Sequence, residues 1–370
     1  MIRGERARSN IAVILGTRPE TIKLAGIIRL LGPSARIVHT GQHYDARLGS
    51  NLFCELGLPP PDVTLSVGGA PRGEQIGSAV HALDLHFGED PPLAVVVQGD
   101  TNAALAGALA ANARALPLVH VEAGLRSYDR AMPEEHNRVV IDHLADLCCT
   151  PTETTRANLQ REGIVGDRVT LTGNTVVEAL LRLVPARPER RRLLRRMRLP
   201  AASFVLTTLH RPENVDDPVR LAWLLRELGH LELPVILPMH PRTAARIEDF
   251  GLTSLLACIR VVEPLAYGDF LALASECAFM VSDSGGVQEE ASVVKRPVLV
   301  VRNSTERPEV CGTFAQLVRP GEPISEHAHQ WFGFGGLREL HEKLSSTASP
   351  YGDGSASRLC VDALTDLVGR

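Results

Sequence analysis

Short apolar runs that end in glycine or polar residues recur along the whole chain, and this recurrence limits the possible folds more than any other feature. In the first half the runs cover residues 11–16, 36–41, 93–100, 116–124 and 144–150. The pattern starts again at residues 204–210, 233–240, 258–265, 279–286 and 296–303. Segments of helical period separate the runs. Strands that alternate with helices form parallel sheets through right-handed crossovers, so we predict an α/β fold of two doubly wound, Rossmann-like lobes.

Length and composition agree with two lobes of ordinary size. The chain has 370 residues, of which only 4% are aromatic, and this is typical of helices packed on buried parallel sheets. We place the first lobe at residues 1–183 and the second at 184–350, with the boundary in a segment rich in proline and arginine. A polar break at 345–357 precedes a short apolar helix, residues 358–367, at the end of the chain.

Charge and cysteine content exclude several classes of function. The net charge is −4 with both signs dispersed, so we expect no nucleic-acid partner and no membrane surface. The arginine cluster at 188–198 is local and predicts a solvated helix or a linker. Seven cysteines without metal-ligand spacing indicate buried thiols in a reducing compartment. We find no signal peptide and no membrane span, and therefore predict a cytoplasmic protein.

Polar side chains follow nearly every one of the apolar runs. In open parallel sheets the ligand lies beyond the carboxyl ends of the strands, so these positions are candidates for a binding site. Any one of them alone has an ordinary role as a cap, a turn residue or a surface charge. Together they predict a cleft between the lobes that holds a phosphorylated ligand. They are Thr17, Arg18, Glu20, Gln42, His43, Asp100, Thr101, Glu122, Arg126, His210, Arg211, His240, Asp283, Ser284, Arg302 and Arg307.

The segment SDSGGVQEEA, residues 282–291, is the strongest single candidate for an anion site. It follows an apolar run and opens a predicted helix. Gly285 and Gly286 lack a Cβ atom, so the backbone can approach an anion, which the positive end of the helix dipole attracts. Glu289 or Glu290 is then placed to accept hydrogen bonds from ribose hydroxyl groups. A plain chain reversal is the alternative function of a Gly-Gly turn.

A second strand–glycine–helix segment, GTRPETIK, covers residues 16–23. Arg18 and Lys23 near its helix start would suit a leaving diphosphate. In the alternative, Pro19 only begins the helix, Glu20 complements the helix dipole, and the cations are solvated. The chain has neither a G-x-G-x-x-G loop nor a lysine-bearing phosphate loop, which argues against nicotinamide, flavin and triphosphate hydrolysis.

Carboxyl groups gather on the loops that follow two neighbouring runs. Asp100 follows the first run and Glu122 the second, and Glu134 and Glu135 stand in MPEEHNR shortly afterwards. Carboxylates that share a partly dry site divide into a proton donor and a base, as acid/base chemistry at carbon requires. Structural ion pairs with nearby arginines are the alternative.

One histidine stands at the corresponding position of the second half. His210, in LHRPEN, ends the first run there and is a candidate for binding a diphosphate or for moving a proton. A hydrogen-bonded structural role is the alternative. No histidine or cysteine cluster has metal-ligand spacing, so we predict that no metal is required.

Taken together, these residues resemble the non-hydrolysing UDP-N-acetylglucosamine 2-epimerases. The resemblance implies a two-lobed glycosyltransferase-B fold, with residues 351–370 returning to the first lobe. It also implies a UDP-sugar substrate, no cofactor, no metal and a homodimer. The segments that carry it are GTRPETIKL, TGQHYD, QGDT, VEAGLRS, MPEEHNR, LTGNTVVEAL, LHRPENVDDP, HPRT, SDSGGVQEEA, RNSTERPE and SPYGDG.

The resemblance also implies a reaction and roles for residues. A proton leaves sugar carbon 2 as UDP departs, giving an enzyme-bound 2-acetamidoglucal, and UDP then returns with protonation of the opposite face. By position in the motifs, Asp100, Glu122 and Glu134 form the acid/base group, with His210 and Arg18 assisting the diphosphate. The residues placed on the substrate are Lys23, Arg126, Ser284, Gly285, Gly286, Glu290, Arg302 and Arg307.

Two segments depart from the family pattern. The loop RSYDRAMP, residues 126–133, is shorter than in the cell-envelope enzymes of the family, which leaves the preferred sugar open. Many bacterial members carry a second, activating substrate site, and Asp45 stands where that site has a glutamine. The residues that match it are Gln42, His43, Arg72, Arg211 and His240.

Three other functions compete with the epimerase. A sugar transferase of the same fold would need an acceptor groove and only one base. A hydrolysing epimerase would release UDP and N-acetylmannosamine, and differs only in whether water reaches the glycal first. A silent nucleotide-sugar sensor would keep the anion site and lose the carboxylates, whereas this chain retains Asp100, Glu122 and Glu134.

Overall fold

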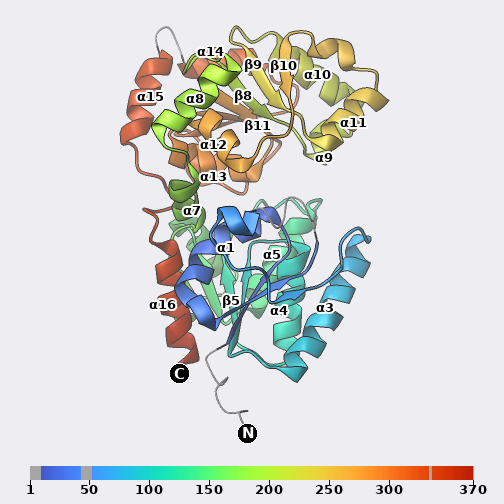
Figure 1. Cartoon of the computed structure of the whole chain (residues 1–370), viewed down its shortest axis with the longest axis vertical. Coiled ribbons are helices and arrows are strands. Elements are labelled where there is room, and N and C mark those ends of the chain that lie inside the picture. The colour runs from blue at the N-terminus through green and yellow to red at the C-terminus, as the bar shows by residue number, and fades with distance from the viewer. Residues whose placement is uncertain (1–9, 43–51, 333–335, 370) are drawn as a thin grey trace. The chain divides into compact units, whose positions relative to one another are not determined.

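The computed structural model describes residues 10–42, 52–332 and 336–369, and it divides the chain into two compact units (Figure 1). The N-terminal unit comprises residues up to Ala179 together with Tyr351 and the residues after it. The C-terminal unit is Leu180–Pro350. The division falls within helix α7 (Val176–Leu183).

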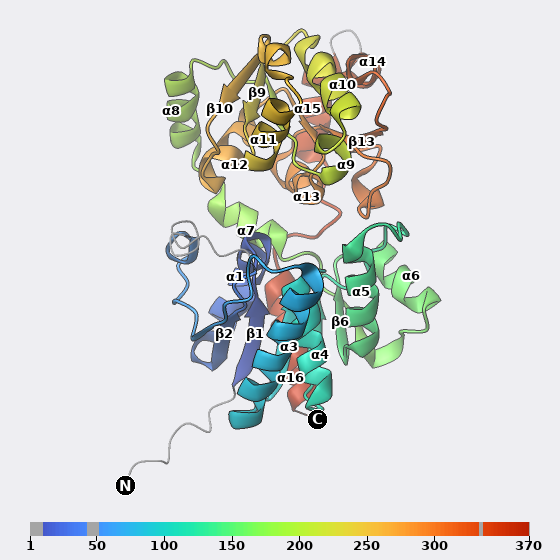
Figure 2. The ribbon, with the colours of Figure 1, turned by 90° about the vertical axis from the view of Figure 1, so that its right-hand side faces the viewer.

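The N-terminal unit is built on a seven-stranded parallel sheet in the order β3-β2-β1-β4-β5-β6-β7. Helices α1 and α16 cover one face and α3 and α4 the other (Figures 1 and 2). The elements are β1 (Ile11–Leu15), α1 (Arg18–Leu31), β2 (Ala35–His39), β3 (Val63–Thr64), α3 (Arg72–Glu89), β4 (Ala94–Gln98), α4 (Asn102–Ala113), β5 (Leu118–Val121), α5 (Pro133–Leu144), β6 (Leu147–Thr150), α6 (Glu153–Arg161), β7 (Val169–Leu171), α7 and α16 (Ala356–Val368).

The C-terminal unit repeats the architecture with a six-stranded parallel sheet, β10-β9-β8-β11-β12-β13. Helix α8 packs on α12 and α10 packs on α14. The elements are α8 (Arg187–Met197), β8 (Val205–Thr208), α9 (Pro212–Val215), α10 (Pro218–Gly229), β9 (Val235–Pro238), α11 (Pro241–Asp249), β10 (Ile259–Val262), α12 (Tyr267–Glu276), β11 (Phe279–Ser282), α13 (Gly285–Val294), β12 (Val298–Val301), β13 (Ala315–Val318), α14 (Ile324–Phe332) and α15 (Gly336–Ser346).

The predicted fold class is confirmed: both units are doubly wound α/β lobes. The arginine cluster is a helix, α8, in which Leu193 and Leu194 are buried while most arginines remain exposed. The expectation of seven buried thiols is only partly right: Cys148 and Cys149 in β6 are fully buried, and Cys277 and Cys360 are buried as well. The other three, Cys54, Cys258 and Cys311, are exposed.

Small residues let helices lie close to their neighbours in the N-terminal unit. A Cβ atom added to Gly107 of α4 would lie 2.8 Å from Cγ1 of Val97 in β4. One added to Gly26 of α1 would lie 2.2 Å from Oγ of Ser357 in α16. The Ser357 N–H also donates to Oε1 of Glu178, at 3.0 Å, which binds the start of α16 to α7. The last helix is therefore an integral part of the N-terminal unit.

Candidate functional site

Each sheet has one position where the strand order reverses, and ligands of such folds bind there. In the N-terminal unit the reversal lies between β1 and β4, so the loops after these strands, at 16–17 and 99–101, flank it. In the C-terminal unit it lies between β8 and β11, flanked by the loops at 209–211 and 283–284. Seven of the sixteen strand-end residues predicted from the sequence lie in these four loops: Thr17, Asp100, Thr101, His210, Arg211, Asp283 and Ser284.

In the N-terminal unit a buried carboxyl group connects the two loops that flank the reversal. Glu20 accepts hydrogen bonds from the Gly16 N–H (3.0 Å), the Thr17 hydroxyl (2.7 Å) and, across the reversal, the Thr101 hydroxyl (2.6 Å). Burial raises the pKa of Glu20 to about 7, although the hydrogen bonds from Thr101 and Thr17 lower it. Glu20 therefore titrates near neutral pH while holding both loops.

This pKa predicts a pH-dependent stability. Because the folded-state pKa of Glu20 is raised above 4.5, its contribution to stability is fully present below pH 4.5 and is lost as the pH rises through about 7. The Glu20→Gln variant lacks this titration. Between pH 4.5 and 8 we expect the free energy of unfolding of the parent chain to fall by about 3 kcal/mol relative to that of the variant.

Urea denaturation of both proteins across this pH range would measure the effect. Subtracting the variant's stability removes the titration of other groups, so a difference that stays constant from pH 4.5 to 8 would contradict the assigned pKa.

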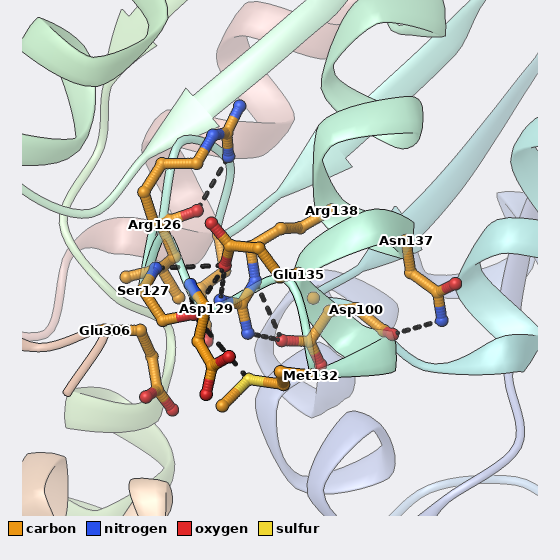
Figure 3. Close-up of polar contacts among 12 residues, drawn as sticks. Asp100, Arg126, Ser127, Asp129, Met132, Glu135, Asn137, Arg138 and Glu306 are labelled. Carbon is orange, nitrogen blue, oxygen red and sulfur yellow. Dashed lines mark hydrogen bonds and ion pairs between the residues drawn. The ribbon is translucent and has the colours of Figure 1, made fainter. Parts of the chain in front are cut away.

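Asp100, the candidate acid/base residue after β4, is bound to an arginine that also holds a neighbouring loop (Figure 3). The Arg138 guanidinium forms an ion pair with the Asp100 carboxylate, and its Nη1 lies 2.5 Å from Oε2 of Glu135. Glu135 accepts from the N–H groups of Ser127 (3.0 Å) and Tyr128 (2.9 Å) and from the Ser127 hydroxyl (2.9 Å). The loop that follows Arg126 is thus held by Glu135, and Arg138 connects it to Asp100.

Glu122, the second candidate, is buried at the end of β5 in a left-handed backbone conformation, with a φ of 69°. This conformation is unfavourable for a residue with a side chain, and such residues cluster at functional sites. The Lys23 ammonium lies 2.5 Å from Oε2 of Glu122. Gln98 and Asn174 also donate to this oxygen, at 3.1 and 3.3 Å. Lys23, predicted to contact the nucleotide, is therefore an ion-pair partner of Glu122 in this structure.

Glu134 and Arg126 have contrasting surroundings. Glu134 is half-buried in the first turn of α5, and its carboxylate has no hydrogen bond or ion pair within the described residues. Arg126 is buried and is bound by Asp142 (2.7 Å) and by both oxygens of Glu162 (2.7 and 2.6 Å). Burial alone lowers the pKa of Arg126, but Glu162 and Asp142 raise it well above its ordinary value. Its assignment to the substrate stays a prediction.

In the C-terminal unit a second buried carboxylate connects the loops that flank the reversal. Asp283, after β11, accepts from the backbone N–H groups of His210 (3.1 Å) and Arg211 (3.0 Å) and from the Asn214 amide (3.3 Å). Its Oδ1 lies 3.2 Å from Nδ1 of His210. Burial raises the pKa of Asp283, but the His210 contacts outweigh it and hold the pKa below the usual range. Asp283 therefore orients the His210 ring through Nδ1, and the role of His210 at the diphosphate stays a prediction.

The predicted anion site has the expected helix start. Helix α13 begins at Gly285, and Ser284 precedes it without a side-chain cap, so the first N–H groups of the helix are not capped by this hydroxyl. Gly286 follows within the first turn. Glu290 accepts from the Tyr267 hydroxyl at 2.6 Å.

Two buried arginines lie beside this helix start and are bound to acidic residues. Nε of Arg307 lies 2.6 Å from Glu289, and its Nη1 contacts Glu306. Nη1 of Arg302 lies 2.8 Å from Glu306. The two arginines that the resemblance places on the substrate therefore belong to one ion-pair network. Arg18, the remaining predicted cation, is exposed at the first residue of α1.

The residues predicted for a second, regulatory site are distributed over both units. The Gln42 amide oxygen accepts from the Ala103 N–H at 2.9 Å, and Arg72 donates to Asn137 at 2.6 Å. His240 accepts from the Arg242 N–H at 3.2 Å at the start of α11, and Arg211 contacts Asp283 through its backbone. His43 lies outside the described residues. The regulatory site stays a prediction.

Several buried residues near the site were not predicted from the sequence. Asp142 stands in the last turn of α5 and His120 within β5, where periodicity marks them only as helix and strand positions. Glu306 had no signal beyond its place beside Arg307. Within the residues that the structure covers, no cluster of three metal-ligating side chains occurs, and no helix is long and apolar enough to cross a membrane.

Comparisons with known proteins agree on one family. A family model described as UDP-N-acetylglucosamine 2-epimerase matches residues 32–365. The chain is 37% identical over 367 residues to the UDP-N-acetylglucosamine 2-epimerase of Methanocaldococcus jannaschii, covering 96% of this chain and 98% of that protein. It is 34% identical over 369 residues to the UDP-2,3-diacetamido-2,3-dideoxy-D-glucuronate 2-epimerase of Pseudomonas aeruginosa, covering 96% and 99%.

Solved structures give the same result. The M. jannaschii UDP-GlcNAc 2-epimerase in complex with UDP-GlcNAc and UDP superposes with a TM-score of 0.81 at 36% identity, covering 96% of this chain and 99% of that one. The Neisseria meningitidis enzyme bound to UDP-GlcNAc has a TM-score of 0.85 at 30% identity, covering 96% and 100%. With the shared fold and a match along nearly its whole length, this chain belongs to the UDP-N-acetylglucosamine 2-epimerase family of isomerases.

Proposed function

We propose that this enzyme interconverts UDP-N-acetylglucosamine and UDP-N-acetylmannosamine without a metal or redox cofactor. The observation that carries the proposal is a trio of carboxyl residues in a chain that matches these epimerases along nearly its whole length. Asp100 follows β4, Glu122 follows β5, and Glu134 lies in the first turn of α5. Reversing a carbon centre through a planar intermediate requires proton transfer on two faces, and hence more than one acid/base group.

In the proposed reaction, a carboxylate of the trio takes the proton from carbon 2 while the bond between carbon 1 and the UDP oxygen breaks. The electrons of the C–H bond form the double bond of the glycal, and those of the C–O bond leave with UDP. The UDP oxygen then adds back to carbon 1, and carbon 2 receives a proton on the other face. His210 and Arg18 would assist the departing diphosphate by stabilising its negative charge.

The nucleotide side of the proposal rests on the start of α13. The first-turn N–H groups and the helix dipole favour an anion there, and Ser284, Gly285, Gly286, Glu290, Arg302 and Arg307 are the proposed contacts in that unit, with Lys23 in the other. A homodimer and a cytoplasmic location also stay predictions of the family resemblance.

A matched pair of glycine variants tests the nucleotide side. A Cβ at Gly285 would lie 2.7 Å from Oε1 of Glu306 and 2.8 Å from Nη1 of Arg307, so it would displace this pair. At Gly229, the last residue of α10 and outside the proposed site, the nearest atom would be Cβ of Cys258, at 3.7 Å, which is an ordinary contact. We expect Gly285→Ala to weaken UDP binding about 10-fold, or about 1.4 kcal/mol, and Gly229→Ala to leave the affinity nearly unchanged. Calorimetric titration with UDP would compare them, and equal affinities would contradict the proposed role of Arg307.

The reaction itself is tested by proton and phosphorus NMR of the enzyme with UDP-N-acetylglucosamine in heavy water. The manno epimer with deuterium at carbon 2 is the expected product. Free UDP with N-acetylmannosamine would indicate the hydrolysing reaction. An unchanged spectrum would overturn the proposed substrate, and UDP-2,3-diacetamido-2,3-dideoxy-D-glucuronate, the sugar named for the P. aeruginosa relative, would be tested next. Transfer of the sugar to an acceptor would instead support the transferase.

A further inference from the structure

His120 is a fully buried histidine whose two ring nitrogens both face hydrogen-bond acceptors. It lies in the middle of β5 with no exposed surface. Nε2 is 2.8 Å from the carbonyl oxygen of Gly99, and Nδ1 is 2.6 Å from Oδ1 of Asp142. A backbone carbonyl can only accept, so Nε2 carries a hydrogen. The protonation of Nδ1 therefore depends on Asp142.

Asp142 is surrounded by donors. Besides His120, it contacts Nη1 of Arg126 at 2.7 Å and the Gly124 N–H at 3.2 and 3.3 Å. Burial raises the pKa of Asp142, but His120 and Arg126 outweigh burial and hold that pKa below its usual range. A protonated Asp142 would also have to place its hydroxyl among N–H groups. Asp142 is therefore a carboxylate, and Nδ1 of His120 carries the second hydrogen.

Further charged groups surround the pair. Glu162 binds Arg126, and Nε2 of His143 lies 3.6 Å from Glu162. The second hydrogen of the His120 ring therefore rests on its two acceptors, Gly99 and Asp142, and not on a sum of charges. The other groups next to Asp142 are the Cys148 thiol and Arg168, which donate to its backbone carbonyl at 3.6 and 3.4 Å. Burial raises the pKa of Cys148 to well above its usual value, so this thiol stays neutral.

The pair also holds backbone on both sides. Gly99 immediately precedes Asp100 and has a φ of 68°, while Gly124, with a φ of 82°, closes the turn that contains Glu122. His120 fixes the carbonyl of Gly99, and Asp142 fixes the N–H of Gly124. One ion pair thereby sets the loops that carry two of the three proposed acid/base residues.

We propose that His120 is an imidazolium, paired with Asp142, that acts as a positioning residue for Asp100 and Glu122. The functional part rests on the proposed epimerase reaction. The protonation state does not, and the two parts are tested separately.

NMR of the full chain with nitrogen-15-labelled histidine tests the protonation state, with His120 assigned by its absence from the His120→Gln spectrum. Because each ring nitrogen of His120 faces an acceptor, we expect both to carry a hydrogen at pH 8. An unprotonated ring nitrogen in His120 at pH 8 would overturn the proposal, whatever reaction the enzyme catalyses.

Two substitutions test positioning because their amides reach different places. In His120→Gln the amide nitrogen can take the position of the histidine Nε2 and still donate to the Gly99 carbonyl. In His120→Asn the shorter side chain places its amide nitrogen at the position of Nδ1, so the hydrogen bond to Gly99 is lost. We expect His120→Asn to lower kcat about 100-fold and His120→Gln about 10-fold, with KM changed less than about 3-fold, because small displacements of reacting groups are costly in rate. His81→Gln on the exposed face of α3 should match the parent.

Equal kcat values for the parent and both folded variants would overturn the positioning role. If the parent catalyses no epimerisation, kcat cannot be compared, and the chemical shifts of the backbone amides of Gly99, Asp100 and Thr101 are measured instead. They should change in His120→Asn and not in His81→Gln, and unchanged resonances would count against positioning. If neither variant folds, His120 is assigned in the parent by nuclear Overhauser effects between its ring hydrogens and the Gly99 backbone, and an unprotonated ring nitrogen there would still overturn the proposal.

Discussion

We expect Asp100→Asn to lower kcat about 1,000-fold while UDP binding stays within about 2-fold of the parent, because general acid/base groups typically contribute 10²- to 10⁴-fold. The substitution keeps the shape of the side chain and removes its ability to exchange a proton. Asp100 lies in the N-terminal unit, whereas most proposed UDP contacts lie in the C-terminal unit. Initial rates from the NMR assay and calorimetry with UDP would measure the two quantities.

A second aspartate–arginine pair provides the control. Asp84 binds Arg114 through contacts of 2.5 and 2.8 Å on the exposed surface of α3. Asp84→Asn therefore removes the same kind of charge and ion pair on the surface of α3, outside the four loops that flank the two reversals, and it should leave kcat unchanged. Near-full turnover in Asp100→Asn would show that Asp100 is not an acid/base group and that its contact with Arg138 is structural.

The sheet cores were predictable because their strands are fully buried. A strand buried on both faces consists of consecutive apolar residues, and IAVIL of β1 and VLVV of β12 are such runs. The strands that were not predicted lie at or near the ends of the sheets. They are β3, β7 and β13, whose sequences VT, VTL and AQLV are short or only partly apolar. An edge strand is covered less completely by the rest of the protein, so its sequence need not be a run of consecutive apolar residues.

Strand-end positions of the site were predictable for a related reason. Parallel strands all end at one edge of their sheet, so the position of a polar residue in sequence indicates its position in space. This brought Glu20, Thr101, His210 and Asp283 into the candidate set. The pairing of these residues was not predictable, because Glu20 and Thr101, or His210 and Asp283, are joined only by the order of strands in the sheet.

The partners of the cations were also beyond local sequence. Lys23 lies 99 residues from Glu122 in the chain, yet the two form one buried ion pair. A lysine near a helix start satisfies the pattern of a phosphate ligand equally well with or without that partner. The sequence therefore predicts which cations lie near the site. Which of them form ion pairs with carboxylates depends on the three-dimensional fold.

Among the cations of the site, Arg126 is the one whose removal should destabilise the fold most. We expect Arg126→Ala to lower the free energy of unfolding by about 3–5 kcal/mol. Its guanidinium is buried and binds both Asp142 and Glu162. Removing it leaves the fully buried Asp142 carboxylate with His120 alone among its charged side-chain partners, and removing one member of a buried ion pair costs more than the pair contributes. Urea denaturation monitored by circular dichroism would measure the loss.

The exposed pair of Arg156 and Glu153, 2.6 Å apart on α6, is the matched control. Arg156→Ala should cost less than about 0.5 kcal/mol, because solvent screens surface ion pairs. Arg126→Lys should fall between the two, since lysine keeps the charge but cannot bind Glu162 with two parallel hydrogen bonds. If Arg126→Ala instead kept the stability of the parent and raised KM for the UDP-sugar, Arg126 would be a substrate ligand, and its contacts with Asp142 and Glu162 would have to give way when the sugar binds.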